Sequence, residues 1–204
     1  MKKIILTSTG TTSETAKNAV LNLIPSLPNK NAVIITTASK NKENNKWNII
    51  TKDQFIEMGY EKIDFLDLET NPNINLSEYG TIYVAGGNTF KLMKFVGESN
   101  FKEEVEKCLE KGGVYIGSSA GAIIATPTIQ IAGEITPDEN AVNLQDLTGM
   151  NLVKFEILPH YEQENNKELE DYQKKTEREI KLISNEEIIV IYENNWFTRN
   201  QWRK

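Results

Sequence analysis

VYIGSSAGA, residues 114–122, joins an apolar run to a run of small residues. The run from Val114 to Ile116 is typical of a buried strand, and residues 122–125 continue as a short helix that Pro127 ends. Between them lies a Gly-x-Ser-x-Gly spacing with Ser119 at its centre. A strand, a tight turn at a serine and a helix are the parts of a nucleophile elbow at the end of a strand.

The rest of the chain alternates short apolar runs with helical patterns. Further strands are expected at residues 3–6, 32–36, 63–66, 81–85, 155–158 and 188–192. Runs without polar alternation are typical of strands buried on both faces, and strand–helix alternation is typical of a parallel sheet. We therefore predict an α/β fold, a three-layer sandwich with a mainly parallel central sheet. No repeat or linker divides the sequence, so residues 1–204 are expected to form a single domain.

The helical patterns carry apolar residues on one face. The first helix is expected to begin at a capping box, with Thr11 as the cap and Glu14 reaching back to it. Residues 40–58 read as a polar helix, and Cys108 as a small buried hydrophobe on another. Apolar residues at helical spacing over 169–183 predict one long charged helix.

Composition excludes several classes of protein. The 23 Lys and Arg residues against 29 Asp and Glu give a net charge of −6, which disfavours a nucleic-acid or anionic-membrane binder. One cysteine and one histidine, His160, exclude an internal disulfide framework, a multi-cysteine zinc site and His-pair metal motifs. We expect no metal and no organic cofactor.

Neither a targeting signal nor a run near the about 20 apolar residues of a membrane span is visible, so a cytoplasmic protein is expected. An aromatic and basic tail closes the chain. We expect it to pack on the sheet edge or at a subunit contact, as in a homodimer, rather than to stack on single-stranded nucleic acid. Its residues are Trp196, Phe197, Arg199, Trp202 and Arg203.

Serine chemistry at an elbow needs a base, a carboxylate and oxyanion donors. His160 is the sole imidazole, and it follows an expected strand. The amide of Ala120, next to Ser119, is expected to point at the oxyanion. Spacing alone does not choose the carboxylate. The candidates are Glu134, Asp138, Glu139 and Asp146.

A second glycine-rich loop, GGNT at residues 86–89, follows the expected strand over 81–85. The backbone amides of this loop could supply another oxyanion donor, because glycines allow close approach of the backbone. The loop could instead be a plain turn in which Asn88 or Thr89 caps the next helix. Phosphate binding is disfavoured, because the loop has no basic residue and lacks the P-loop spacing.

Three segments together resemble the signatures of the peptidase E (α-aspartyl dipeptidase) family of serine peptidases. These are VAGGNTF at 84–90, GSSAGA at 117–122 and LPHY at 158–161. The resemblance implies a class I glutamine amidotransferase-like fold without a cofactor. It also implies that Ser119 is the nucleophile and His160 the general base.

The same resemblance assigns the remaining site residues. Glu134 aligns with the third member of the triad, where the dipeptidases carry Asp, and Asp138 is held in reserve. The amides of Gly87 and Ala120 would form the oxyanion hole. Asn88 and Gln130 are expected to contact the substrate.

One departure from the family bears on the substrate. Gln130 stands where the dipeptidases carry Arg, which leaves a preference for N-terminal Asp open, and Arg178 is a candidate substitute. The expected function is therefore a serine exopeptidase that hydrolyses short peptides through a Ser-His-Glu triad and an acyl-enzyme. The alternatives are an esterase or acyltransferase using the same triad, and a non-catalytic peptide-binding protein of the same fold.

Overall fold

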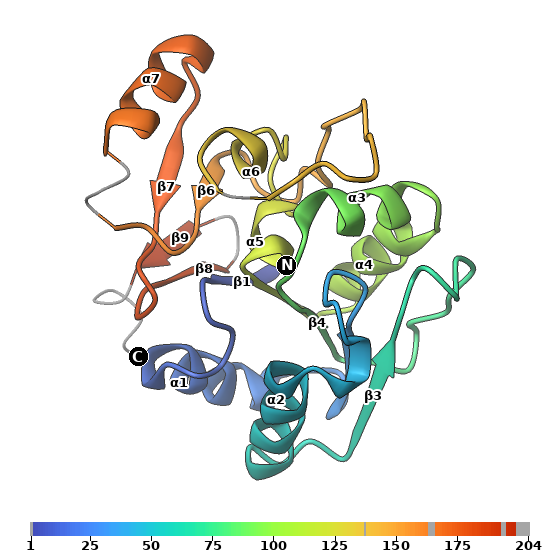
Figure 1. Ribbon diagram of the computed structural model, residues 1–204. Coiled ribbons are helices and arrows are strands. Elements are labelled where there is room, and N and C mark those ends of the chain that lie inside the picture. Colours follow the sequence, from blue (N-terminus) through green and yellow to red (C-terminus); the bar gives the residue numbers. More distant parts are fainter. Residues whose placement is uncertain (1, 137, 163–165, 193–194, 199–204) are drawn as a thin grey trace.

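Seven strands form the central sheet of the computed structural model, which describes residues 2–136, 138–162, 166–192 and 195–198 (Figure 1). Their order is β3-β2-β4-β5-β1-β8-β9. The first five are mutually parallel, whereas β8 runs antiparallel to β1 and β9 antiparallel to β8. The predicted, mainly parallel sheet is confirmed. The strands are β1 Lys3–Thr7, β2 Asn31–Ile35, β3 Lys62–Leu66, β4 Thr81–Val84, β5 Val114–Ser118, β8 Ile188–Tyr192 and β9 Asn195–Thr198.

Helices cover both faces of the sheet, which gives the predicted three layers. In Figure 1, α1 and α2 lie below the sheet, and α3, α4, α5 and α6 lie above it. The helices are α1 Glu14–Leu23, α2 Lys46–Glu57, α3 Thr89–Gly97, α4 Phe101–Glu110, α5 Ala120–Ile123, α6 Ile131–Glu134 and α7 Asn166–Thr176.

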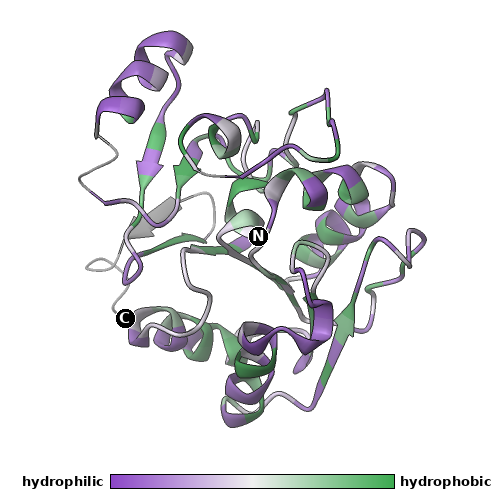
Figure 2. Cartoon of the chain, viewed as in Figure 1, coloured by the Kyte–Doolittle hydropathy of each residue, from purple (hydrophilic) through white to green (hydrophobic). Residues whose placement is uncertain are grey.

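Alternating residues of the inner strands of the main sheet feed two separate cores. On β1, Ile4 and Leu6 enter the core shared with α3, α4 and α5, whereas Ile5 enters the core shared with α1 and α2. Each side chain is fully buried, because successive residues of a strand point to opposite faces. Figure 2 accordingly shows hydrophobic colour along the strands and hydrophilic colour on outward parts of the helices.

The first helix begins two residues later than predicted. Ser13, not Thr11, is the N-cap, and its Oγ accepts a hydrogen bond from the amide of Ala16 at 3.2 Å. Thr11 instead donates its hydroxyl hydrogen to Oε1 of Gln54 on α2, at 2.6 Å. The prediction was wrong because several adjacent hydroxyls could cap the helix, and a contact distant in sequence engages one of them.

The predicted helix over 169–183 is also shorter than expected. α7 ends at Thr176, and Glu177 adopts a φ of +54°, which a continuing right-handed helix excludes. The next residues form β7 (Ile180–Leu182), which pairs in parallel with β6 (Glu156–Leu158) in a separate two-stranded sheet. The apolar spacing of this segment was therefore misread, because its second half belongs to a strand.

At the far edge of the main sheet, the backbone of β9 adds a strand to β8. The packing predicted for the tail concerns residues outside the described part of the chain, including Arg199, Trp202 and Arg203, and it stays a prediction. None of the helices in the described ranges combines the length and apolarity needed to cross a membrane.

Cys108 is buried on α4, as predicted, and its thiol lies 3.6 Å from the carbonyl oxygen of Tyr79. Burial raises the pKa of the Cys108 thiol from 9.0 to about 11, so at pH 8 the thiol stays protonated. We expect alkylation by iodoacetamide at pH 8 to be at least about 100-fold slower in the native protein than in guanidinium-unfolded protein. Equal rates in the two states would contradict this assignment.

Candidate active site

Ser119 directly follows β5 and occupies the tight turn predicted for it. Its φ of +51° and ψ of −111° are unfavourable for a residue with a side chain, and such strain is concentrated at functional sites. Its amide donates to the carbonyl of Thr7 at 2.9 Å, which fixes the turn against β1. Glycine is needed at both ends of the motif. A Cβ at Gly117 would collide with the carbonyl of Gly121, and one at Gly121 with the carbonyl of Val84.

His160 lies beside Ser119, although 41 residues separate them. Its Nε2 is 3.0 Å from the Oγ of Ser119. The backbone amide of His160 donates to the Oγ of Ser8, just beyond β1, at 3.0 Å. That same Ser8 hydroxyl donates to the carbonyl of Ser184 at 3.0 Å, so one side chain ties the histidine segment to the connection between β7 and β8.

Asn185, in that connection, holds the other nitrogen of the imidazole. Its Oδ1 is 2.7 Å from Nδ1 of His160. Because an amide oxygen only accepts hydrogen bonds, Nδ1 carries the proton and Nε2 is left free to accept the hydroxyl hydrogen of Ser119. The hydroxyl of Thr9 donates to the carbonyl of Asn185 at 3.0 Å and holds this loop in place.

Glu134 is not brought to His160. Its carboxylate pairs with Nζ of Lys175 at 2.8 Å and accepts from Nε2 of Gln130 at 3.3 Å. The ion pair with Lys175 lowers the pKa of Glu134 below its ordinary value. The physical reason is its position on α6, which packs against α7, the helix that carries Lys175. Asn185 occupies the place beside Nδ1 that was predicted for a carboxylate.

Asp138, the reserve candidate, also has another partner. Its Oδ2 accepts from the amide of Thr89 at 2.8 Å, at the start of α3. Asn88 caps the same helix, with Oδ1 accepting from the amide of Lys91 at 2.8 Å and Nδ2 donating to the carbonyl of Glu139. The side chain expected to contact substrate is therefore engaged by the first turn of α3 and by the loop that contains Glu139.

Gln130, the other residue expected to contact substrate, is bound to Glu134 and to Arg178, whose Nη1 lies 3.3 Å from its Oε1. Arg178 also pairs with the fully buried carboxylate of Glu156 at 2.9 Å. Neither Gln130 nor Arg178 lies on the wall of the cavity that contains Ser119. The structure therefore places the candidate guanidinium in a structural ion pair.

The two predicted oxyanion donors flank Ser119. Ala120 is the first residue of α5, so its amide lacks an intrahelical acceptor. Gly87 has a φ of +144°, and a Cβ there would collide with the carbonyl of Ala38. Among the described residues, no group accepts a hydrogen bond from either amide. A Cβ added at the neighbouring Gly86 would lie 3.0 Å from the Cβ of Ser119, which shows how closely this loop approaches the serine.

A cavity of about 390 Å³ opens beside these groups, within the size range of small-molecule sites. Ser119, His160 and Gly87 line it together with Asn48 and Thr51 of α2. Within the described ranges, no group of three acidic, histidine or cysteine side chains is placed to hold a metal ion.

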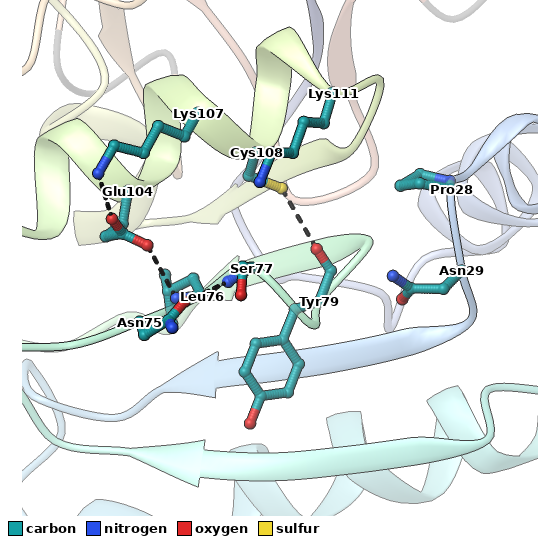
Figure 3. A pocket seen from close by; sticks show the side chains of 10 residues that line it. All are labelled: Pro28, Asn29, Asn75, Leu76, Ser77, Tyr79, Glu104, Lys107, Cys108 and Lys111. Atoms are coloured by element: carbon teal, nitrogen blue, oxygen red, sulfur yellow. Dashed lines mark hydrogen bonds and ion pairs between the residues drawn. The ribbon is translucent and has the colours of Figure 1, made fainter.

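A second hollow of about 430 Å³ lies at the opposite edge of the sheet, near the amino ends of β2, β4 and β5 (Figure 3). Its one carboxylate and its thiol are already engaged. Glu104 accepts from the amide of Leu76 at 2.9 Å and pairs with Lys107 at 2.7 Å, while the thiol of Cys108 faces the carbonyl of Tyr79. This hollow offers no nucleophile and base in contact, so the chemistry is placed at the Ser119 edge.

A strained serine that is hydrogen-bonded to a histidine lies at the carboxyl edge of a parallel sheet. These features define the class of protein as a serine-type hydrolase of α/β architecture. The chain belongs to peptidase family S51, whose family model matches residues 4–200. The resemblance to peptidase E found in the sequence is confirmed, and the protein is a serine-type peptidase.

Individual relatives agree with this assignment. An uncharacterized peptidase of Pasteurella multocida is 33% identical over 165 residues, which cover 79% of this chain and 78% of that protein. Peptidase E of Escherichia coli O1:K1 is 34% identical over 122 residues, 57% of this chain and 50% of that protein, so the match spans half of the relative's length. A crystal structure from Listeria monocytogenes EGD-e, described provisionally as a peptidase E, has a TM-score of 0.77 at 29% identity over 97% of this chain and 98% of that one.

Asn185 was missed in the sequence because only acidic residues between the serine and the histidine were considered. The feature that brings it to the site belongs to the assembled sheet. β8 is antiparallel to its neighbour, with Ile188 opposite Thr7, so the residues that precede β8 lie at the same edge as the end of β5. A polar residue just before an antiparallel strand of this kind reaches the active edge.

Proposed function

We propose that this peptidase is a serine exopeptidase of the dipeptidase type, which cleaves short peptides through an acyl-enzyme. The observation that carries the proposal is the 3.0 Å contact between Nε2 of His160 and Oγ of Ser119 on the wall of the cavity. That distance allows direct proton transfer between the two atoms. The cavity volume, near the lower end of the about 300–1,000 Å³ range for ligand pockets, suits a short peptide.

In the first half-reaction, Nε2 of His160 accepts the hydroxyl proton of Ser119 while Oγ attacks the scissile carbonyl carbon. The amides of Gly87 and Ala120 donate to the oxyanion that forms. His160 then gives its proton to the leaving nitrogen, the C–N bond breaks, and an ester to Ser119 remains. Water repeats the sequence, with His160 as its base, and releases the acid and the free serine.

Asn185 completes a Ser-His-Asn arrangement in place of the expected Ser-His-Glu triad. As the acceptor for Nδ1–H, it fixes the orientation and tautomer of His160. A neutral amide stabilises the imidazolium less than a carboxylate would, because it contributes a dipole and no net charge. Asn185 is therefore proposed as a positioning residue.

A fluorophosphonate probe combined with a substrate screen tests the proposal. We expect the probe to label the wild-type protein at Ser119, with labelling lost in Ser119→Ala, and at least one dipeptide in a library to be hydrolysed. Labelling that persists in Ser119→Ala would contradict the assigned nucleophile. Turnover of esters with no turnover of any peptide would replace the exopeptidase with an esterase, and failure of both assays on folded protein would favour a binding protein.

A further inference from the structure

The hydroxyl groups around the cavity are already engaged in hydrogen bonds within the protein. Five of them donate to backbone carbonyls: Ser8 to Ile183 and Ser184, Thr9 to Asn185, Thr12 to Thr9, Ser39 to Gly86, and Ser118 to Ser8. A substrate carboxylate needs free donors to replace its water. The cavity therefore offers few neutral donors to a charged side chain.

The side-chain hydrogen-bond donors that α2 contributes to the cavity are also bound within the protein. Nδ2 of Asn48 donates to Oγ of Ser39 at 3.2 Å and to the carbonyl of Lys42 at 2.7 Å. The hydroxyl of Thr51 faces the hydroxyl of Tyr83 at 3.5 Å, and both residues are buried. The amide nitrogen of Asn48 and the hydroxyl of Thr51 therefore direct their hydrogens to other groups of the protein rather than to a ligand.

Charge on the wall is sparse. Among the described residues that line the cavity, none is Asp, Glu or Arg, and Lys40 is the one lysine. Lys40 is exposed to solvent. A solvent-exposed ion pair with a substrate carboxylate would change affinity by at most about fivefold.

Trp47 supplies a large apolar surface at the same cavity. It lies in the first turn of α2, where Oδ1 of the N-cap residue Asn45 accepts from its amide at 2.9 Å. The ammonium group of Lys46 lies 4.7 Å from the ring centroid and makes a cation–π contact with the indole. Yet 56% of Trp47 is exposed, which is unusual for an indole on a cavity wall.

We infer that the cavity selects a large neutral side chain of the substrate, aromatic or branched aliphatic, which packs against Trp47. The inference rests on the proposed function, because it assigns a substrate class to that same site. Burying such a side chain is worth roughly 10- to 100-fold in affinity, more than an exposed ammonium group at the rim can give. The preference therefore differs from the aspartyl preference that the family resemblance suggests.

Two dipeptide series test the inference, one varying the first residue and one the second, each through Ala, Leu, Phe and Asp. We expect one series to show kcat/KM for Leu and Phe at least about tenfold above Asp. Trp47→Ala is expected to reduce the Leu and Phe values about 10- to 100-fold and the Ala value several-fold less. Trp47→Phe should keep most of the wild-type kcat/KM for the Leu and Phe substrates. Ile56→Ala, equally exposed on α2 but away from the cavity, is the matched control and should change nothing.

Other outcomes overturn the inference. One is an Asp preference that Lys40→Gln removes and Trp47→Ala leaves intact. Another is a fall in kcat/KM in Trp47→Ala that is equal for all substrates or is matched in Ile56→Ala. Either result would indicate a general structural effect. Failure of the proposed function looks different, because peptide hydrolysis would then survive in Ser119→Ala. If hydrolysis requires Ser119 but is unchanged in Trp47→Ala, the specificity inference is wrong and the proposed function stands.

Discussion

Ser119→Ala is expected to lower kcat for the best dipeptide by about 10⁴-fold or more while leaving the protein folded. The substitution removes the atom proposed to form the acyl-enzyme, and His160 then has no hydroxyl proton to accept at 3.0 Å. Residual turnover would come from substrate binding and the oxyanion donors alone. Steady-state kinetics with the wild-type enzyme alongside, and a thermal melt followed by circular dichroism, check both parts of the expectation.

The matched control is the neighbouring serine. Ser118 is buried at the end of β5, and its Oγ donates to the carbonyl of Ser8 at 3.4 Å rather than contacting the histidine. Ser118→Ala is therefore expected to lower kcat less than about tenfold, in line with the loss of one long hydrogen bond. An equal loss in both variants, or a greater loss in Ser118→Ala, would mean that the nucleophile has been assigned to the wrong serine.

Much of the fold could be predicted because its pattern is local. Continuous apolar runs such as Val33 to Ile35 indicate burial on both faces, and the two cores confirm it, with Ile34 on one side of the sheet and Val33 on the other. The motif around Ser119 was equally informative, since each of its glycines is needed where two backbones meet. Local sequence carries this information because no distant partner is required to interpret it.

The errors share a different cause, which is competition from distant residues. Spacing alone made residues 169–183 look like one helix, but Leu182 pairs with Leu158 in a strand that lies far back along the chain. Likewise, Thr11 could cap a helix by its chemistry, yet Gln54 binds its hydroxyl. Propensity and periodicity do not see such partners, so the ends of elements were less accurate than their order.

The third member of the proposed catalytic arrangement shows the same limit at the site. The sequence offered several acids between Ser119 and His160, and spacing could not rank them. In the structure Glu134 is bound by Lys175. Asn185 contacts the imidazole from the connection between β7 and β8, which follows His160 in the sequence. The antiparallel direction of β8 places Asn185 at the edge of the sheet where Ser119 lies. Strand direction is a property of the assembled sheet.

Asn185→Leu is expected to lower kcat about 100- to 1,000-fold with little change in KM. Leucine is similar in size but cannot accept the hydrogen bond from Nδ1, so His160 loses its fixed tautomer and orientation. A merely structural role would instead lower stability. Kinetics and thermal melts of the same preparations separate the two, and Asn185→Asp, which keeps an acceptor at the same place, is the conservative variant that should retain activity.

Asn185→Asp also gives a readout that packing alone would not move. A carboxylate beside the ring stabilises the imidazolium, so the base becomes neutral only at higher pH. The acidic limb of the kcat/KM profile is therefore expected to shift upward in Asn185→Asp relative to the wild type. Glu134→Gln, which breaks only an exposed ion pair with Lys175, should leave both rate and profile within about threefold of the wild type. A loss above about 100-fold in Glu134→Gln, with Asn185→Leu nearly unaffected, would return the third position to the glutamate.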